Sequence, residues 1–165
     1  PVLDAGCGTG DMALHLAASG HNVTGFDYLE EPIRRAQAKA TDRNLAVDFR
    51  VADATKLRDW PERFHTIVDS GLFHVFTDDD RQRYVAGLAH VLAPGGKLYL
   101  MCFSDEEPGN YGPRRIAREE LHSAFAEGWA IESIEPTQFE LNPKFTGAQF
   151  SPGGPKSWFA TIKRI

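Results

Sequence analysis

The residues best suited to chemistry form a glycine-rich turn near the start of the chain, Asp4-Ala5-Gly6-Cys7-Gly8-Thr9-Gly10. Glycine occupies every second position, after an apolar run expected to be a strand and before a run with helical spacing. Because glycine has no side chain and tolerates positive φ, such a turn lets a ligand lie directly against the main chain. The pattern predicts a ligand-binding turn between a strand and a helix.

The spacing of the glycines also bears on the kind of ligand. A dinucleotide-binding fingerprint places its third glycine three residues after the second, at the start of a helix that receives a pyrophosphate. Position 11 in this chain is Asp, and a carboxylate there repels a pyrophosphate. The sequence therefore favours a bulkier, less anionic ligand that need not carry phosphate.

Three further acids fall at the ends of expected strands. Asp27 closes the second strand, where a carboxylate can accept hydrogen bonds from ribose hydroxyls. Asp53 closes the third, where its side chain and the Ala54 amide can read an adenine edge, and Asp69 closes the fourth. The carboxyl ends of parallel strands share one edge of a sheet. We therefore expect a nucleoside-binding crevice at that edge.

The elements that must position these residues alternate along the chain. Expected strands are residues 2–5, 21–26, 46–51, 64–68, 97–103, 129–134 and 157–165, and expected helices are residues 12–18, 31–40, 78–92 and 118–126. Strands separated by helices need crossover connections, which predicts a parallel sheet with helices on both faces. The final two strands, joined by a loop rich in Pro and Gly, are expected to pair antiparallel.

Two segments carry a family resemblance. Val2-Leu3-Asp4-Ala5-Gly6-Cys7-Gly8-Thr9-Gly10 resembles motif I of the class I S-adenosylmethionine-dependent methyltransferases, and Leu92-Ala93-Pro94-Gly95-Gly96-Lys97-Leu98 resembles their L-x-P-G-G turn. The resemblance implies an α/β fold, a Rossmann-like three-layer sandwich. Its seven-stranded, mostly parallel sheet has order 3-2-1-4-5-7-6, with the last strand antiparallel and helices on both faces. Because the chain begins inside the first strand, we expect residues 1–165 to be one domain without its N-terminal cap segment.

The resemblance also implies a cofactor, S-adenosyl-L-methionine, with S-adenosyl-L-homocysteine as its product. It implies that Asp4 orients the turn and the methionine ammonium, that Asp27 holds the ribose, and that Asp53 with Ala54 contacts adenine. The remaining cofactor-binding residues that it implies are Gly6, Cys7, Gly8, Thr9, Gly10, Tyr28, Asp69, Ser70 and Gly71. Of these, Ser70 and Gly71 line the methionine end beside the sulfonium.

The methyl acceptor is expected to be a small molecule. Residues 68–76 and 102–105 resemble a bacterial subgroup related to thiopurine and thiol methyltransferases. That resemblance suggests a pocket lined by Phe73, Phe103 and Tyr111, for an acceptor whose nucleophile is sulfur, oxygen or nitrogen. Direct displacement needs alignment and no covalent nucleophile. His74 is the candidate general base because imidazole titrates near neutrality, with a capping or packing role as the alternative.

Composition argues against several other classes of function. The formal charge of −5 over 165 residues gives no basic surface for a phosphate backbone, so no nucleic-acid partner is expected. No apolar run is long enough to span a bilayer, which, with two isolated cysteines, predicts a cytoplasmic protein. Residues 78–80, all Asp, are expected to begin a helix rather than bind a metal.

Two other functions remain as alternatives. One is a nicotinamide-dependent oxidoreductase on a related fold, and the other is a non-catalytic methyltransferase-like module. The sequence leaves open the acceptor atom and the oligomeric state.

Overall fold

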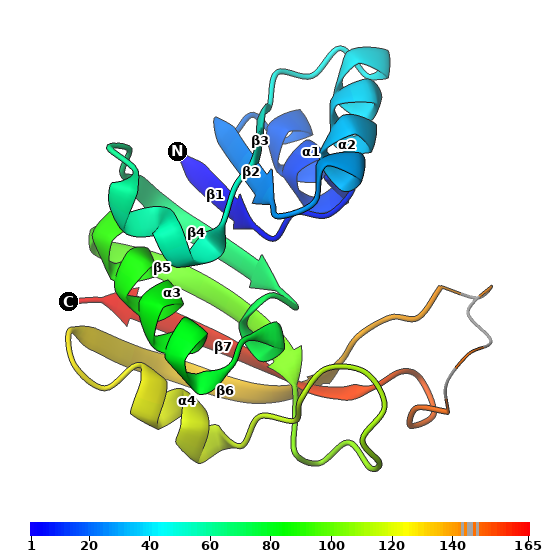
Figure 1. The fold of residues 1–165 in the computed structure, drawn as a ribbon, viewed down its shortest axis with the longest axis vertical. Helices are drawn as coiled ribbons and strands as arrows, with labels where there is room; N and C mark the ends of the chain where they lie inside the picture. The colour runs from blue at the N-terminus through cyan, green and yellow to red at the C-terminus, as the bar shows by residue number, and fades with distance from the viewer. Residues whose placement is uncertain (143, 145–146, 148) are drawn as a thin grey trace.

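A computed structural model describes residues 1–142, 144, 147 and 149–165, which form a seven-stranded sheet between helices (Figure 1). The sheet order is β3-β2-β1-β4-β5-β7-β6. The strands are β1 (Val2–Ala5), β2 (Val23–Asp27), β3 (Asp48–Val51), β4 (Phe64–Ser70), β5 (Leu92–Phe103), β6 (Trp129–Gln138) and β7 (Lys156–Arg164). Strands β1 to β5 pair in parallel, whereas β7 is antiparallel to both β5 and β6. The predicted strand order is confirmed.

The four predicted α-helices are present: α1 (Asp11–Ala18), α2 (Glu30–Asp42), α3 (Asp78–Val91) and α4 (Arg118–Ala124). Thr77 begins α3 by accepting a hydrogen bond from the Asp80 amide at 3.2 Å, as expected of an N-cap residue. Two short 3₁₀ helices, η1 (Ala54–Asp59) and η2 (Phe73–Val75), were not predicted from the sequence. They are too short for hydrophobic periodicity to reveal them.

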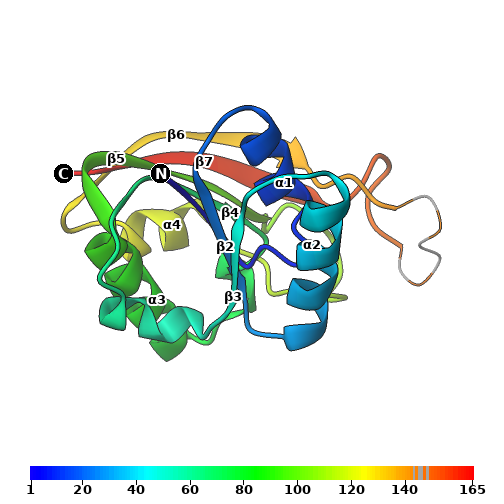
Figure 2. The same cartoon turned by 90° about the horizontal axis from the view of Figure 1, so that it is seen from above.

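Helices pack on both faces of the sheet, and those on each face cover different strands (Figure 2). On one face α1 and α2 bury Leu14 and Ile33 against β1 to β3. On the other face η1, α3 and α4 bury Leu57, Leu88 and Leu121 against β4, β5 and β7. Each such side chain contributes about 1.5–3 kcal/mol by leaving water. The sheet is thus held by two separate apolar cores, one on each face.

The junction between α3 and β5 departs from the sequence expectation. The sequence predicted a helix through Leu92 and a strand from Lys97. In the structure α3 ends at Val91, and Leu92 already pairs with Phe64 before residues 93–96 bulge out and pairing resumes at Lys97. The side chain of Leu92 is buried in the core, and this burial holds the chain against the sheet before the Pro-Gly-Gly turn.

None of the helices formed by the described residues has the length and hydrophobicity needed to cross a bilayer. Cys7 and Cys102 are both free thiols, one half-buried and the other buried.

Candidate functional site

The glycine-rich turn between β1 and α1 is closely packed on one side and open on the other. Gly6, Gly8 and Gly10 all have positive φ, at 69°, 51° and 80°. A Cβ on Gly10 would lie 2.7 Å from both Ala36 Cβ and Phe49 Cζ, so only glycine fits there. A Cβ on Gly8 would have no atom within 4 Å. Gly8 therefore presents bare backbone to open space, as a ligand cradle requires.

Asp27 joins the end of β2 to this turn. Its Oδ2 accepts a hydrogen bond from the Gly8 amide at 3.0 Å, and its Oδ1 accepts one from the Leu29 amide at 3.0 Å. Tyr28, the next residue, is 73% exposed. Each carboxylate oxygen keeps a second lone pair, so Asp27 can still accept hydrogen bonds from a ligand hydroxyl.

Asp4 lies beneath the same turn, with 3% of its surface exposed. Within the part of the chain that the structure describes, its Oδ2 is buried without a hydrogen-bond partner. Burial raises the pKa of this carboxyl to about 7, and the nearby charges of Asp69 and Asp27 add to the effect, against a lowering hydrogen bond from the Ala13 backbone. An unpaired buried carboxylate oxygen is suited to a cationic donor such as an ammonium group.

Asp53 caps the 3₁₀ helix η1. Its Oδ1 accepts hydrogen bonds from the Thr55 amide at 2.9 Å and the Thr55 hydroxyl at 2.7 Å, and these bonds lower the pKa of Asp53. Ala54 is buried at the helix start. The cap fixes the chain direction immediately after β3, at the same sheet edge as Asp27.

Asp69 faces inward, which corrects the expectation that its side chain contacts the cofactor. It has no exposed surface. Its Oδ1 accepts hydrogen bonds from the Leu72 and Phe73 amides at 2.8 and 3.2 Å, and its Oδ2 accepts one from the Tyr84 hydroxyl at 2.9 Å. Burial raises the pKa of Asp69 to about 6. The side chain shapes the turn containing Ser70 and Gly71, while its own oxygens are used inside the fold.

Aromatic rings gather beside that turn and define what we call the aromatic cluster: Phe103, Tyr111, Phe139 and Phe150. The Phe103 ring lies 5.5 Å from Phe139 and 5.6 Å from Phe150, and Tyr111 lies 5.8 Å from Phe150. A Cβ on Gly71 would lie 3.8 Å from the Phe139 ring. The cluster therefore borders the predicted methionine end of the site, at the carboxyl edge of β4 and β5.

Phe73 does not join this cluster, which corrects its predicted place in an acceptor pocket. Its side chain is fully buried in the core. The ring stacks on Phe125 at 5.7 Å, and the Arg81 guanidinium lies 4.7 Å from its centre. Phe73 begins η2, and this 3₁₀ turn directs its ring toward α3 and α4 instead of the sheet edge.

The surroundings of His74 do not suit the predicted general base. The side chain is 4% exposed, and its Nδ1 accepts a hydrogen bond from the Phe103 amide at 2.9 Å. Burial lowers the pKa of His74 to about 4, with a further lowering from the charge of Arg115, opposed by a hydrogen bond with the Gly71 backbone. A group with so low a pKa is a weak proton acceptor at neutral pH. His74 instead joins the β4 turn to the end of β5.

Several residues around the site were not predicted from the sequence. Lys39 on α2 pairs with Asp11 at 2.8 Å and also donates to the Thr9 carbonyl at 3.1 Å. The Asp11 charge is therefore compensated, so Asp11 repels a pyrophosphate less strongly than the sequence alone indicates. No local pattern marks Lys39. Phe139 and Phe150 were detectable in principle, as aromatic residues inside a Pro- and Gly-rich loop.

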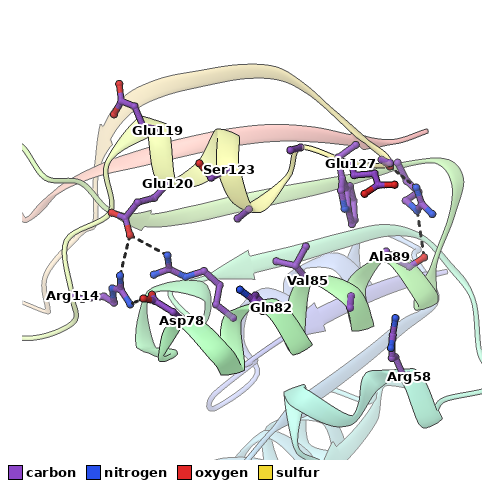
Figure 3. A pocket seen from close by; sticks show the side chains of 17 residues that line it. Arg58, Asp78, Gln82, Val85, Ala89, Arg114, Glu119, Glu120, Ser123 and Glu127 are labelled. Carbon is purple, nitrogen blue, oxygen red and sulfur yellow. Dashed lines mark hydrogen bonds and ion pairs between the residues drawn. The ribbon is translucent and has the colours of Figure 1, made fainter.

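A separate hollow of about 1080 Å³ lies between α3 and α4 and contains none of the predicted site residues (Figure 3). Glu120 lies between two guanidinium groups, those of Arg114 at 3.0 Å and Arg81 at 3.1 Å. Arg114 also pairs with Asp78 at 2.8 Å. The charges at this end of the hollow are thus largely paired with each other, and they fasten α4 to the start of α3. Nowhere among the described residues do three or more His, Cys, Asp or Glu side chains converge as a metal site.

Comparison with known proteins places the chain in a family. Residues 2–96 match the family model for a methyltransferase domain. A 2-heptyl-1-hydroxyquinolin-4(1H)-one methyltransferase from Mycobacteroides abscessus is 34% identical over 156 residues, covering 93% of this chain and 67% of that protein.

Solved structures agree with this family. One from work on the conversion of a disulfide bond into a thioacetal group during echinomycin biosynthesis has a TM-score of 0.83 and 37% identity, covering 99% of this chain and 75% of that one. A 1,6-didemethyltoxoflavin-N1-methyltransferase from Burkholderia thailandensis shares the fold, with a TM-score of 0.77 and 24% identity over 99% of this chain and 70% of that one. The chain belongs to the methyltransferase-domain family and is an S-adenosylmethionine-dependent methyltransferase.

Proposed function

We propose that residues 1–165 form one methyltransferase domain that methylates a small molecule at sulfur, oxygen or nitrogen by direct displacement. The observation that carries the proposal is the glycine turn, open above Gly8, with the Asp27 carboxylate beside it and an unpaired oxygen of Asp4 beneath it. A nucleoside joined to a cationic amino acid matches these three features together.

The residues proposed to hold the cofactor lie along the carboxyl edge of β1 to β4. Asp27 accepts hydrogen bonds from the ribose hydroxyls, and Asp4 faces the ammonium group through its free Oδ2. When bound, S-adenosylmethionine supplies an electrophilic methyl group on a sulfonium sulfur. The other residues that we propose for contacts with the cofactor are Gly6, Cys7, Gly8, Thr9, Gly10, Tyr28, Asp53, Ala54, Ser70 and Gly71.

The acceptor site is proposed to lie at the aromatic cluster, beyond Gly71. Faces and edges of aromatic rings suit a planar acceptor, which they hold by stacking and edge contacts. The 34% identical relative from Mycobacteroides abscessus supports such a class, because it is a methyltransferase of a hydroxyquinolinone. The resemblance to thiopurine and thiol methyltransferases fits the same class, extended to planar thiols.

The acceptor is also proposed to ionise without help from His74. A histidine whose pKa is about 4 removes few protons at neutral pH. Thiols and acidic hydroxyl groups lose a proton near neutrality by themselves, so they need only alignment with the methyl group. We therefore favour such acceptors over amines that are protonated at neutral pH.

A thermal-shift assay tests the cofactor assignment. S-adenosylhomocysteine should raise the melting temperature, and the rise should grow with the logarithm of its concentration above the dissociation constant, because a ligand that binds only the folded state stabilises it. NAD should have no effect. The Asp27→Ala variant should weaken the shift from S-adenosylhomocysteine. A shift with NAD alone would instead support the nicotinamide-dependent oxidoreductase.

Turnover tests the acceptor assignment. Planar thiols, phenols, N-hydroxy heterocycles, amines and carboxylates are screened for production of S-adenosylhomocysteine. We expect product with planar thiols or acidic hydroxyl compounds. Binding of S-adenosylhomocysteine with no turnover on any of these acceptors would favour a non-catalytic module.

A further inference from the structure

The aromatic cluster is built from two chain segments far apart in sequence. The connection from β5 to α4 carries Tyr111, and the connection from β6 to β7 carries Phe139 and Phe150. Both leave the sheet at the same end (Figure 1). Because loops are usually the most mobile part of a fold, an acceptor site shared between two of them needs a contact that fixes one against the other.

Glu107 makes such a contact. It lies on the β5–α4 connection, yet its carboxylate accepts two hydrogen bonds from backbone amides far along the chain. Ser151 of the other connection donates to Oε1 at 3.0 Å, and Lys156, the first residue of β7, donates to Oε2 at 2.8 Å. The side chain is only 2% exposed. A buried carboxylate with both oxygens bonded to backbone amides of a second segment is a strong, directional link, since charged acceptors form stronger hydrogen bonds than neutral ones.

Arg115 binds several backbone carbonyls of the β5–α4 connection, to which it belongs. Its guanidinium lies 5.2 Å from the centre of the Phe103 ring. It donates hydrogen bonds to the backbone carbonyls of Glu107, Pro108, Tyr111 and Pro113, at 3.1, 3.3, 3.1 and 2.7 Å. Because a guanidinium offers five donors in a fixed plane, one side chain can close this loop over Phe103.

We propose that Glu107 and Arg115 are positioning residues that set the geometry of the acceptor site, a role that rests on the proposed function. Arg115 folds the β5–α4 connection over Phe103, and Glu107 fastens that connection to the segment carrying Phe150. Neither residue needs to touch the acceptor. They determine the separation of the rings that do.

Glu107→Gln is the primary test. The amide keeps one acceptor oxygen but places an N–H₂ donor against a backbone N–H, so one of the two bonds is replaced by a donor facing a donor. With the best acceptor from the screen, KM should rise about tenfold or more, as expected for losing a buried charge-assisted bond. The dissociation constant of S-adenosylhomocysteine should stay unchanged. Glu106→Gln, at an exposed neighbouring position, is the matched control and should leave both values unchanged.

Hydrogen exchange gives a readout that does not depend on turnover. The Ser151 and Lys156 amides should exchange faster in Glu107→Gln than in the parent protein, with the Gly8 amide unaffected. An unchanged acceptor KM, unchanged exchange at both amides, or an equal loss of cofactor affinity would each overturn the proposal.

A second variant covers the case in which Glu107→Gln does not fold. Arg115→Lys keeps the charge but cannot span the loop carbonyls, and should raise the acceptor KM without changing the affinity for S-adenosylhomocysteine. An unchanged acceptor KM in this variant would overturn the proposal. A parent protein that binds no S-adenosylhomocysteine would reject the proposed function instead, and the exchange rates would then decide whether Glu107 joins the two connections.

Discussion

Single residues determine whether the glycine turn can form and whether it can accept a ligand. Substitution of Gly10 tests the first requirement, and substitution of Gly8 tests the second. We predict that Gly10→Ala lowers the free energy of unfolding by about 2–4 kcal/mol, from the left-handed backbone and the overlap of a new Cβ with neighbouring atoms. That Cβ would lie 2.7 Å from Ala36 and Phe49 side-chain atoms. Urea denaturation measures the loss.

Gly8→Ala is the matched comparison. Its φ is also positive, but its Cβ would point into open space. We expect a smaller loss of stability, about 1–2 kcal/mol from the backbone alone, together with a clear loss of affinity for S-adenosylhomocysteine. Equal losses of stability in the two variants would contradict the packing account of the turn.

Asp4 should make stability depend on pH. Its folded pKa is about 7 and its ordinary value is 3.8. Between these two pH values the folded protein keeps a proton on Asp4 that the unfolded chain releases. The contribution of Asp4 to the free energy of unfolding is therefore complete below pH 3.8 and is lost as pH rises toward 7. The loss is about 4 kcal/mol. Asp4→Asn should reduce the fall in melting temperature over this interval.

Asp53→Asn is the control, because the pKa of Asp53 is shifted in the opposite direction to that of Asp4. Hydrogen bonds from the Thr55 hydroxyl and amide lower the pKa of Asp53, so its contribution to stability is lost only as pH falls through that lowered value. This variant should keep the decline between about pH 4 and pH 7. If Asp4→Asn shows the parent's decline unchanged, the carboxyl of Asp4 is not responsible for it.

At the scale of elements, one buried contact fastens α3 to β4. The Tyr84 hydroxyl donates to Asp69 Oδ2 at 2.9 Å. We predict that Tyr84→Phe lowers the free energy of unfolding by about 1–3 kcal/mol, because it leaves a buried carboxylate oxygen without this partner. Chemical denaturation above pH 6 measures the effect. Tyr99→Phe, at a half-buried position on β5, should cost less, and an equal cost would contradict the account.

The elements themselves were largely predictable from the sequence, because their signals are local. Apolar runs and Gly or Pro boundaries reveal strands and helices, and the order of the sheet followed from a family resemblance. The direction of side chains after a strand was not predictable. Phe73 and His74 follow β4 closely, but the short helix η2 directs the first into the core and buries the second against Phe103. Sequence spacing carries no information about such a turn.

Contacts between segments that are distant in sequence were also not predictable. Asp27, Asp53 and the glycine turn were predictable because each follows a strand, and parallel strands bring their ends together. Glu107 and Lys39 act on segments far away in sequence, and no local pattern distinguishes them from solvated surface charges. Their roles become visible only in the folded chain.

In the whole molecule the proposed cofactor site and the proposed acceptor site lie on two halves of one sheet. Strands β1 to β3, with α1 and α2, carry the turn and Asp27, whereas the end of β5 and the connections after β5 and β6 carry the aromatic cluster. The pairing of β1 with β4 brings the two halves together. If the proposed cofactor and acceptor sites are correct, the methyl group passes between β1 and β4, near Gly71.

The structure of the protein with bound S-adenosylhomocysteine tests this account most directly. We predict that the ligand lies across the turn from Gly6 to Gly10, its ribose on the Asp27 carboxylate and its ammonium near Asp4, with the sulfur directed toward Gly71. A ligand seated instead between α3 and α4, or a ribose that makes no contact with Asp27, would contradict it.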